Sequence, residues 1–406
     1  MENVIEILKK WNPWEREMQE GVKRKEYIKR IFPFMERKEI IVLKGIRRSG
    51  KSTIIKQLIN ELLRNGTDKG QVLYINLEDY GFANNLNLGL FDIIFEEYKN
   101  YTKNKKTTYF FIDEAQKIKS WEKWVRTKYD LSENIKFIVT GSSASLLSKE
   151  FSALLTGRNI SFTILPLSFK EYCFFTKKED FEEYISRGGF PEVVLEKSDE
   201  KKNYLLQQYF EDIIHKDIID RYNIRNTKQI INLARYLISS SSSKVSINKL
   251  SKVFGIAKDT IATYISYMVD AYLLAEVSYF SYSAKTKHDV SKLPKFYALD
   301  NGFIRIANTK YSENTGQMFE NSVFIKLLEK YKEISYWGEL SSEVDFIINK
   351  TAINVTSTDD IPKREFKGLE EFNKKFKDFT TIIVSNTLKK DRIIPIKDFL
   401  NQELSY

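Results

Sequence analysis

The segment GIRRSGKST, residues 45–53, constrains this chain more than any other feature of its sequence. It fits the pattern G-x-x-x-x-G-K-[ST], in which glycines let backbone N–H groups curl around phosphate oxygens. An apolar run, EIIVLK, precedes the segment, and an amphipathic run, KSTIIKQLINELLRNG, overlaps its end and continues it. This strand–loop–helix context is the one that a phosphate-binding loop requires, so a chance match at a turn is the weaker interpretation.

We therefore predict a nucleotide site at this loop. Lys51 is expected to reach the β- and γ-phosphates, and Ser52 is placed to bind Mg²⁺. The positive end of the following helix's dipole would face the same phosphates. The predicted nucleotide-binding residues are Gly45, Arg48, Ser49, Gly50, Lys51, Ser52 and Thr53.

A pair of carboxylates follows a later apolar run, in TYFFIDEAQ. We expect Asp113 to hold the Mg²⁺ shell and Glu114 to polarise an attacking water, a role that a kinase with an organic acceptor would not need there. The pair therefore favours hydrolysis of ATP, with ATP and Mg²⁺ as the cofactors. The alternative is that Glu114 only caps the next helix.

Two further segments carry candidate residues for this site. The run IKFIVTGSS ends in hydroxyls, of which Ser142 could orient the water or sense the γ-phosphate, or could simply belong to a turn. In LLTGRNISF, Arg158 is a candidate arginine finger, acting within the chain or on a neighbouring subunit of a homo-oligomer. Its alternative is a surface salt bridge.

Strand-like apolar runs alternate with helical runs between residues 38 and 165. Continuous β-branched and aromatic runs separated by helices are typical of a parallel sheet that is buried on both faces. We predict an α/β P-loop domain there, preceded by a helical approach segment over residues 1–37. From residue 166 to 230 the pattern becomes helical, which fits a lid on the nucleotide domain.

The order of several motifs resembles a known family, the archaeal and bacterial ATPases of the AAA+/STAND-related group that carry a DUF4143 C-terminal region. The motifs are NPW, GIRRSGKST, YINLED, FFIDEAQ, VTGSSASLLSKEF, LTGR, LPLSFKEY and GGFPE. The resemblance covers nearly the whole chain. It implies a P-loop ATPase core, a helical lid, a winged helix and a C-terminal domain similar to restriction-endonuclease-like nucleases. Its loop, metal, water, sensor and finger positions coincide with Lys51, Ser52, Asp113, Glu114, Ser142 and Arg158.

Independently of the family, residues 231–295 contain a helix-turn-helix pattern with a possible wing. Between Lys244 and Lys295 there are eight lysines and four acidic residues, a net charge of +4, and four of the lysines cluster in the wing: Lys285, Lys287, Lys292 and Lys295. Winged helices bind DNA, but they also bind proteins. The predicted DNA-contacting residues are Lys258, Thr260, Lys285, Lys287 and Lys292.

The last segment, residues 296–406, departs from the nuclease pattern that it resembles. Such a nuclease needs acids on a helix and a middle strand, followed by Glu-x-Lys, to hold Mg²⁺ and steady the attacking water. Candidate acids are present at Glu320, Glu343 and Asp345, but the Glu-x-Lys positions are occupied by Asn354 and Thr356. We therefore predict a nuclease-like fold without nuclease activity, which could instead hold DNA or a partner.

Composition limits the remaining possibilities. The chain has 406 residues, of which 42% are hydrophobic, so about two to four folded domains are expected. A single cysteine excludes an internal disulfide and a cysteine-based zinc site. No stretch reaches 18 uninterrupted apolar residues and no signal peptide is evident, so we expect a cytoplasmic protein without a membrane partner.

Together these features predict a Mg²⁺-dependent ATPase whose nucleotide state repositions a winged helix and a nuclease-like domain. The formal charge of +10 makes duplex or branched DNA a plausible partner. Two alternatives belong to other classes. One is a signalling switch that hydrolyses ATP slowly and recruits proteins, and the other is an active restriction-like nuclease, against which Asn354 and Thr356 argue.

Overall fold

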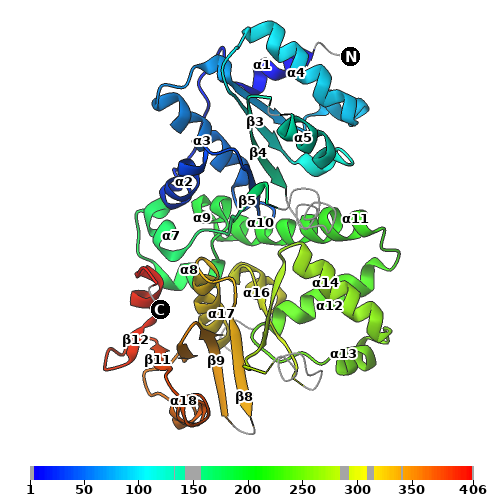
Figure 1. Ribbon diagram of the computed structural model, residues 1–406. Helices are drawn as coiled ribbons and strands as arrows, with labels where there is room; N and C mark the ends of the chain where they lie inside the picture. The colour runs from blue at the N-terminus through cyan, green and yellow to red at the C-terminus, as the bar shows by residue number, and fades with distance from the viewer. Residues whose placement is uncertain are drawn as a thin grey trace. The chain divides into compact units, whose positions relative to one another are not determined.

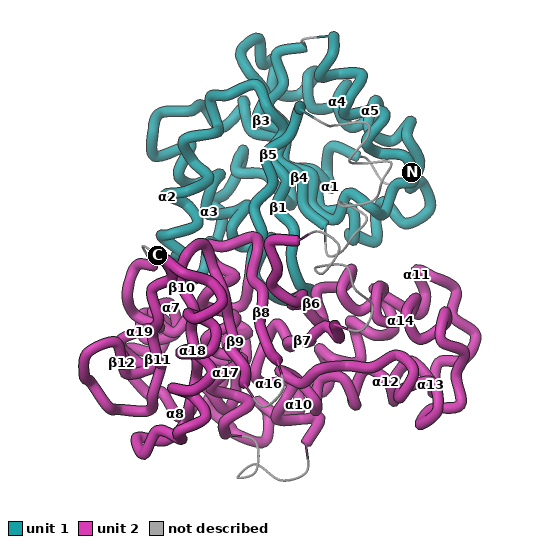
Figure 2. The backbone as a smooth tube through the Cα atoms, turned by 60° about the horizontal axis from the view of Figure 1, so that its bottom comes forward, with its two compact units in different colours: residues 1–164 teal, residues 165–406 magenta. Residues whose placement is uncertain are grey.

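The computed structural model divides into two compact units, residues 1–164 and 165–406 (Figures 1 and 2). It describes residues 4–131, 133–141, 157–283, 292–308, 315–339 and 342–404. Three residues of the predicted sites, Ser142, Lys285 and Lys287, lie outside this part of the chain. Among the described helices, none is both long and apolar enough to cross a bilayer.

Unit 1 is built on a five-stranded sheet in the order β2-β3-β4-β1-β5, in which every pair of neighbours is parallel. The α/β fold with a parallel sheet, predicted from the alternating runs, is thus confirmed. The strands are β1 (Ile40–Lys44), β2 (Val72–Asn76), β3 (Thr108–Asp113), β4 (Ile135–Gly141) and β5 (Asn159–Thr163).

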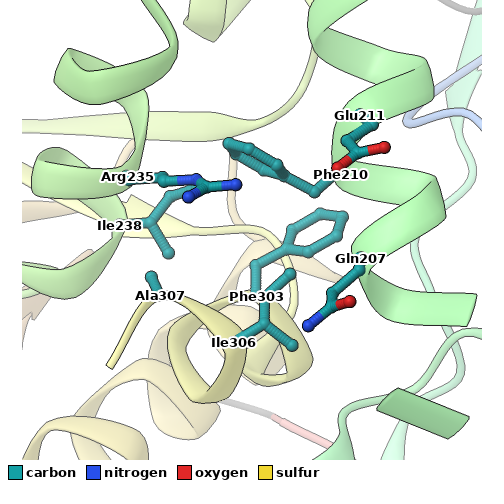
Figure 3. A pocket seen from close by; sticks show the side chains of 8 residues that line it. All are labelled: Gln207, Phe210, Glu211, Arg235, Ile238, Phe303, Ile306 and Ala307. Carbon is teal, nitrogen blue, oxygen red and sulfur yellow. The ribbon is translucent and has the colours of Figure 1, made fainter. Parts of the chain in front are cut away.

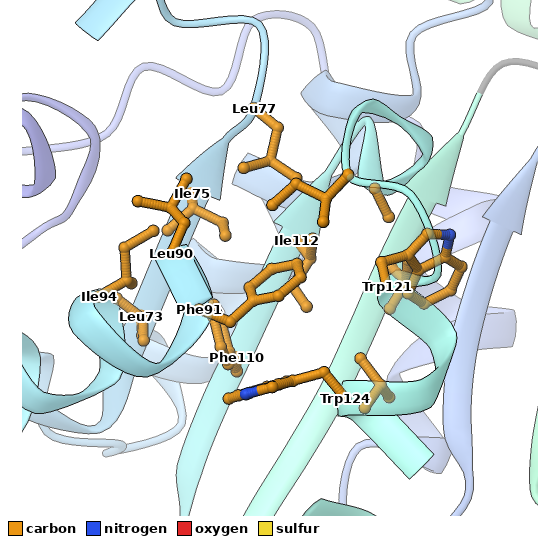
Figure 4. Close-up of a cluster of buried hydrophobic side chains, with 14 of the residues drawn as sticks. Leu73, Ile75, Leu77, Leu90, Phe91, Ile94, Phe110, Ile112, Trp121 and Trp124 are labelled. Atoms are coloured by element: carbon orange, nitrogen blue, oxygen red, sulfur yellow. The ribbon is translucent and has the colours of Figure 1, made fainter. Parts of the chain in front are cut away.

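Helices cover both faces of this sheet, because successive strand residues point to opposite sides. One face packs against α1, α4 and α5 in a cluster that contains the stacked rings of Phe91 and Trp124, 5.0 Å apart (Figure 4). The other face packs against α2 and α3. The helices are α1 (Val4–Trp11), α2 (Lys25–Ile31), α3 (Lys51–Arg64), α4 (Leu88–Thr102) and α5 (Trp121–Asp130), with short 3₁₀ turns η1 (Phe32–Phe34), η2 (Lys69–Gln71), η3 (Tyr80–Asn85) and η4 (Ala115–Lys117).

The NPW segment closes one edge of the sheet. The fully buried Asn12 side chain accepts the backbone N–H of Tyr74 at 2.7 Å and donates to the Tyr74 carbonyl at 2.9 Å. Trp14 donates its indole N–H to the Val72 carbonyl at 2.9 Å. Since β2 is the end strand, these side chains satisfy backbone groups that a neighbouring strand would otherwise pair with.

Unit 2 combines helices with a seven-stranded mixed sheet in the order β12-β11-β10-β9-β8-β6-β7. Its strands are β6 (Leu274–Tyr279), β7 (Lys295–Ala298), β8 (Ser335–Glu339), β9 (Ser342–Ile348), β10 (Thr351–Val355), β11 (Thr380–Ser385) and β12 (Ile393–Pro395). Its helices are α7 (Phe169–Thr176), α8 (Phe181–Arg187), α9 (Pro191–Leu195), α10 (Asp199–Asp212), the π-helix η6 (Ile213–Ile219), α11 (Asp220–Tyr222), α12 (Thr227–Ser239), α13 (Ile247–Phe254), α14 (Lys258–Asp270), α16 (Asn301–Ala307), α17 (Thr315–Leu328), α18 (Lys363–Lys375) and α19 (Ile396–Asn401).

Three segments that the sequence predicts as separate domains pack together in this unit. The β6–β7 hairpin of the predicted winged helix joins the C-terminal sheet, because β6 pairs in parallel with β8. The helices of the predicted lid pack inside the same unit, with α8 and α10 against α16 and α7 against α19. That these helices cover a bound nucleotide stays a prediction.

A buried carboxylate joins the GGFPE turn to α16. Asp300 accepts backbone N–H groups from Gly189 at 2.7 Å and Gly302 at 2.8 Å. Gly188 has φ +78°, and a Cβ atom there would lie 1.8 Å from an Asp300 oxygen, so the turn needs glycine. Burial raises the pKa of Asp300 to about 7, although the two N–H donors act in the opposite direction.

The edge contact predicts a loss of stability in Asn12→Ala. The variant leaves a buried N–H and a buried C=O of β2 without partners, which should cost about 2–4 kcal/mol. Differential scanning fluorimetry should show the melting transition of unit 1 lowered by roughly 5–10 °C. Asn84→Ala changes an exposed asparagine of the same unit and is the matched control. Equal melting temperatures in the two variants would contradict the assigned role of Asn12.

The raised pKa of Asp300 predicts a pH dependence of stability. Well below the ordinary pKa of 3.8, the carboxyl group is protonated in the folded and unfolded chain alike. As the pH rises towards about 7 the unfolded chain releases this proton first, so folding loses up to about 4 kcal/mol over that window.

Denaturant titrations between pH 4 and 7.5 measure this slope. Asp300→Asn removes the titrating group, so the decline should largely disappear, while stability at pH 5 falls because an amide keeps only one acceptor oxygen. The exposed Asp360→Asn variant is the control. A wild-type slope that persists in Asp300→Asn would show that other groups cause it.

Candidate functional site

The predicted phosphate loop joins the end of β1 to the start of α3, at the carboxyl edge of the parallel sheet. Gly45 has φ +144°, and a Cβ atom there would lie 2.2 Å from the Ile164 carbonyl oxygen, so only glycine fits. Gly50 has φ +95° and precedes the first residue of α3, Lys51. Ser52 and Thr53 therefore lie in the first helical turn, where backbone N–H groups are available to phosphate.

Inside the loop, Lys51 is only 5% exposed, and its ammonium donates to the carbonyls of Gly45 and Ile46, both at 3.0 Å. The Ser49 hydroxyl is fully buried and finds no hydrogen-bond partner among the described residues. Arg48, by contrast, is exposed at φ +67°. A buried loop hydroxyl without a partner, together with the backbone N–H groups of the curled loop and the Lys51 ammonium, suits the binding of a phosphate group.

An arginine that sequence reasoning missed supports the loop from the N-terminal side. The Arg24 guanidinium is 2% exposed, donates to the Ser49 carbonyl at 2.9 Å and lies over the Tyr27 ring at 4.5 Å. Its own backbone N–H donates to the Gln57 side chain of α3 at 3.0 Å. Arg24 lies in the basic run VKRKEY, which gives no sign of which cation becomes buried.

The predicted metal carboxylate is held by hydroxyls from both neighbouring strands. Asp113, at the end of β3, accepts the Tyr74 hydroxyl of β2 at 3.0 Å and the Thr140 hydroxyl of β4. The Thr140 oxygen also accepts the backbone N–H of Glu114 at 3.1 Å. Since β4 lies between β3 and β1, Thr140 stands between the two acids and the phosphate loop. Thr140 is one of the hydroxyl-bearing residues at the end of IKFIVTGSS, and it lies in the part of the chain that the structure describes.

Glu114 lies directly after β3, at φ +57°. Among the described residues, its side chain makes no cap hydrogen bond to η4, which the capping alternative would require. The Gln116 side-chain amide donates to the Glu114 carboxylate instead. Burial raises the pKa of Glu114, while the nearby charges of Lys51 and Arg47 lower it. Lys51 is thus close enough to Glu114 for its charge to lower the pKa of that carboxyl group.

These residues suit a nucleotide with its magnesium ion. The Ser52 hydroxyl and the Asp113 carboxylate are oxygen ligands of the kind that Mg²⁺ prefers. Lys51 supplies positive charge for phosphate oxygens, and Glu114 supplies a carboxylate that can accept a proton from water.

Arg158 is placed elsewhere. Arg158 directly precedes β5, and the first residue of β5, Asn159, is paired with Ile40, the first residue of β1. Arg158 therefore lies at the amino edge of the sheet, whereas the phosphate loop lies at the carboxyl edge. Its guanidinium pairs with Asp130 at 3.0 Å. This geometry agrees with the salt-bridge alternative and gives no support to a finger within the same site. A finger acting on a neighbouring subunit stays a prediction.

Unit 2 brings together the acids that the nuclease resemblance implies. Glu320 on α17 and the β9 residues Glu343 and Asp345 all contact the ammonium of Lys295. Lys295 was expected with the wing lysines, but its side chain is 3% exposed, so it cannot serve a DNA surface. Residues of β7 alternate between two faces, and Lys295 has no polar neighbour in the sequence that would mark the cluster. The burial of Lys295 could therefore not be predicted from the sequence.

Two predicted DNA residues line a cleft of 510 Å³ beside α13 and α14, the predicted helix-turn-helix. Lys258 comes from the start of α14, and Lys292 precedes β7 and lies over the Tyr279 ring at 4.5 Å. Thr260 is half-buried on α14 and does not line the cleft. The cleft also contains the carboxylates of Asp259 and Glu276, so it is not uniformly basic.

A smaller cavity of 190 Å³ lies among α10, α12 and α16 (Figure 3). Phe210, Ile238 and Phe303 form its apolar walls, and the Arg235 guanidinium lies 5.6 Å from the Phe210 ring centre. Its volume falls below the range of about 300–1,000 Å³ that is typical of ligand pockets. It is therefore not a second candidate for nucleotide binding.

Comparison with known proteins adds three family matches. An AAA domain matches residues 37–173, a domain of unknown function (DUF8612) matches 178–314, and a second domain of unknown function (DUF4143) matches 315–401. The uncharacterized protein MJ1544 of Methanocaldococcus jannaschii is 33% identical over 368 residues, covering 84% of this chain and 80% of the relative. An uncharacterized protein of Haemophilus influenzae is 30% identical over 343 residues, covering 81% and 84%.

Among solved structures, the chain is similar to the RuvB Holliday junction branch migration motor of Thermotoga maritima, with a TM-score of 0.32 and 17% identity. That likeness covers 63% of this chain and 89% of RuvB. AMPPCP-bound DnaA from Aquifex aeolicus has a TM-score of 0.31 and 15% identity, covering 64% and 91%.

Proposed function

Because the chain belongs to a family of AAA-type P-loop ATPases with a DUF4143 C-terminal domain, we propose that it binds ATP with Mg²⁺ and hydrolyses it to ADP and phosphate. The observation that carries this proposal is that the Thr140 hydroxyl binds both Asp113 and the backbone of Glu114, while the charge of Lys51 acts on the same Glu114 carboxylate. A phosphate-binding loop alone would suit a kinase or a transporter equally well. The second, buried carboxylate is what favours water as the acceptor.

The residues divide the work. The loop N–H groups and Lys51 would bind the β- and γ-phosphates, and Ser52 and Asp113 would hold the magnesium ion, which supplies positive charge at the phosphate oxygens. Glu114 accepts the proton of the attacking water, so it must be ionised to act. In the structure Lys51 is bound to loop carbonyls, and binding of nucleotide would exchange these contacts for phosphate oxygens.

We further propose that hydrolysis drives a rearrangement on duplex or branched DNA. The order α12, α13, α14 and the β6–β7 hairpin agrees with the predicted winged helix, and it supports DNA binding at the cleft that Lys258 and Lys292 line. Because the hairpin shares a sheet with the nuclease-like strands, the two would move on DNA as one body.

One observation favours the slow signalling switch as an alternative. The Gln116 amide is hydrogen-bonded to the Glu114 carboxylate, the group that hydrolysis needs. If this bond persists when ATP is bound, the carboxylate is held off the water, and turnover would be slow until a partner releases it.

The ATPase proposal predicts the behaviour of two variants. Lys51→Ala removes the phosphate cation and should abolish ATP binding, while Glu114→Gln should keep ATP binding and lower phosphate release by at least about 100-fold. Malachite-green phosphate assays and fluorescent-ATP binding measure the two effects. Exposed residues of unit 1 provide the controls, Lys69→Ala and Glu96→Gln. Wild-type turnover in Glu114→Gln would rule out its role as the base.

DNA binding is tested separately. Lys258→Ala with Lys292→Ala should weaken binding to a duplex and a four-way junction about equally, and should reduce the slope of log affinity against log salt by about 2. Fluorescence anisotropy at several salt concentrations measures this slope. The paired control is Lys332→Ala with Lys350→Ala, two exposed lysines elsewhere in unit 2. If the wild-type chain fails to bind either DNA at low salt, the switch becomes the better interpretation.

A further inference from the structure

A lysine ammonium occupies the centre of the nuclease-like cluster. Lys295 on β7 lies 2.5 Å from a Glu343 oxygen, 3.2 Å from a Glu320 oxygen and 3.5 Å from an Asp345 oxygen. Its side chain is 3% exposed. Carboxylates from one helix and one strand thus surround a fixed positive charge at ion-pair distances.

The residues present do not fit a divalent metal ion. A nuclease of this kind needs its carboxylates turned towards an open position for the ion, whereas here the Lys295 ammonium lies between them. Among the described residues, no group of three or more His, Cys, Asp or Glu side chains is arranged to hold a metal. The next position, Asn354, uses its amide group to donate to Glu365 at 3.0 Å and accepts the Asp345 backbone N–H at 3.1 Å.

Each carboxylate of the cluster has a second donor besides Lys295. The Tyr297 hydroxyl donates to Glu320 at 2.6 Å, the Lys244 ammonium donates to Glu343 at 2.6 Å, and the Val355 backbone N–H donates to Asp345 at 2.9 Å. Buried charges are tolerated when they are paired and hydrogen-bonded. The cluster therefore meets this condition with protein groups alone.

The local electrostatics agree with a stable lysine cation. Burial by itself would lower the pKa of Lys295, but the surrounding acids, Glu320 first among them, raise it well above its ordinary value. Burial would raise the pKa of Glu343, but Lys295 lowers it below its ordinary value. Burial and Glu320 raise the pKa of Asp345.

Lys295 also connects parts of the sheet that no backbone ladder joins. In the strand order β9-β8-β6-β7, two strands separate β7 from β9, and helix α17 contributes from outside the sheet. The backbone of Lys295 forms an isolated bridge with Lys244, which contacts Glu343 through its own side chain. The Lys295 side chain thus links β7 of the predicted winged-helix hairpin to β9 of the nuclease-like segment, in addition to the backbone pairing of β6 with β8.

We propose that the Lys295 ammonium takes the place of the divalent ion in this nuclease-like centre. The centre is then a metal-free joint that fastens the β6–β7 hairpin to α17 and β9, and it does not cleave phosphodiesters.

The experiment compares Mn²⁺ binding and thermal stability in the full chain. A Ser52→Ala background without nucleotide weakens the proposed metal site of the phosphate loop, and loss of Mn²⁺ binding in Asp345→Asn distinguishes a site in the unit 2 cluster from one that Asp113 still supports. In this background we expect no Mn²⁺ binding by electron paramagnetic resonance at 1:1 stoichiometry and a melting temperature that EDTA does not change. Lys295→Met should lower the melting temperature of unit 2 by roughly 10 °C in EDTA, and one Mn²⁺ per chain should restore at least half of this loss.

Two variants keep the test informative if Lys295→Met fails to fold. Lys295→Arg preserves the cation and should stay folded without binding Mn²⁺. Lys326→Met removes another buried lysine, which among the described residues pairs with Glu329 at 3.1 Å, and should create no Mn²⁺ site. Failure of Lys295→Met to fold while both of these variants fold supports the proposal, because only the cation at the centre would then be indispensable.

Three results would overturn it. One is Mn²⁺ binding by the Ser52→Ala background that Asp345→Asn abolishes. Another is Mn²⁺-dependent nicking of a plasmid that is lost in Asp345→Ala. The last is a Lys295→Met variant that neither loses stability nor binds Mn²⁺, since the lysine would then not be acting as the cation of the cluster. None of these readouts depends on ATP hydrolysis, so the ATPase proposal stands or fails separately.

Discussion

The Thr140 hydroxyl, at the carboxyl end of β4, is the contact on which the nucleotide site depends. It donates to Asp113 and accepts the backbone N–H of Glu114, so one oxygen contacts both residues of the pair that we propose for the metal and the attacking water. The strand order places β4 between the strand of the acids and the strand of the phosphate loop. A parallel sheet ends all of these strands at one edge, which is why the phosphate loop and the two acids, about 60 positions apart in the chain, lie at the same edge.

The parts of this site that the sequence predicts are those with a local signature. The loop around Lys51 and the pair Asp113–Glu114 each follow a buried strand directly, so a short pattern fixes both the residue type and its place at the sheet edge. Arg24 has no such signature, because its role comes from packing against α3 and the loop, a contact between distant segments. Arg158 shows a different limit: its motif suggests a finger, but the motif does not show that strand register puts the residue at the amino edge of the sheet, away from the loop of its own chain.

Domain organisation was harder to predict for a similar reason. Changes of pattern along the chain predict a lid, a winged helix and a nuclease-like segment, but they do not show whether these segments share a sheet. The parallel pairing of β6 with β8 and the contacts of Lys295 join segments that look independent in sequence. These contacts make the three predicted segments parts of one compact unit, residues 165–406.

The covered edge of β2 also bears on whether the folding chain pairs with other copies of itself. An open end strand is a template for pairing with another chain, and β2 is rich in β-forming residues. Asn12 and Trp14 precede β2 in the chain, so on the ribosome they are synthesised before the strand that they cover. The strand can thus be covered by its own chain as soon as it forms. A shortened chain without Asn12 and Trp14 would leave the edge backbone groups of β2 free to pair with another copy of the chain.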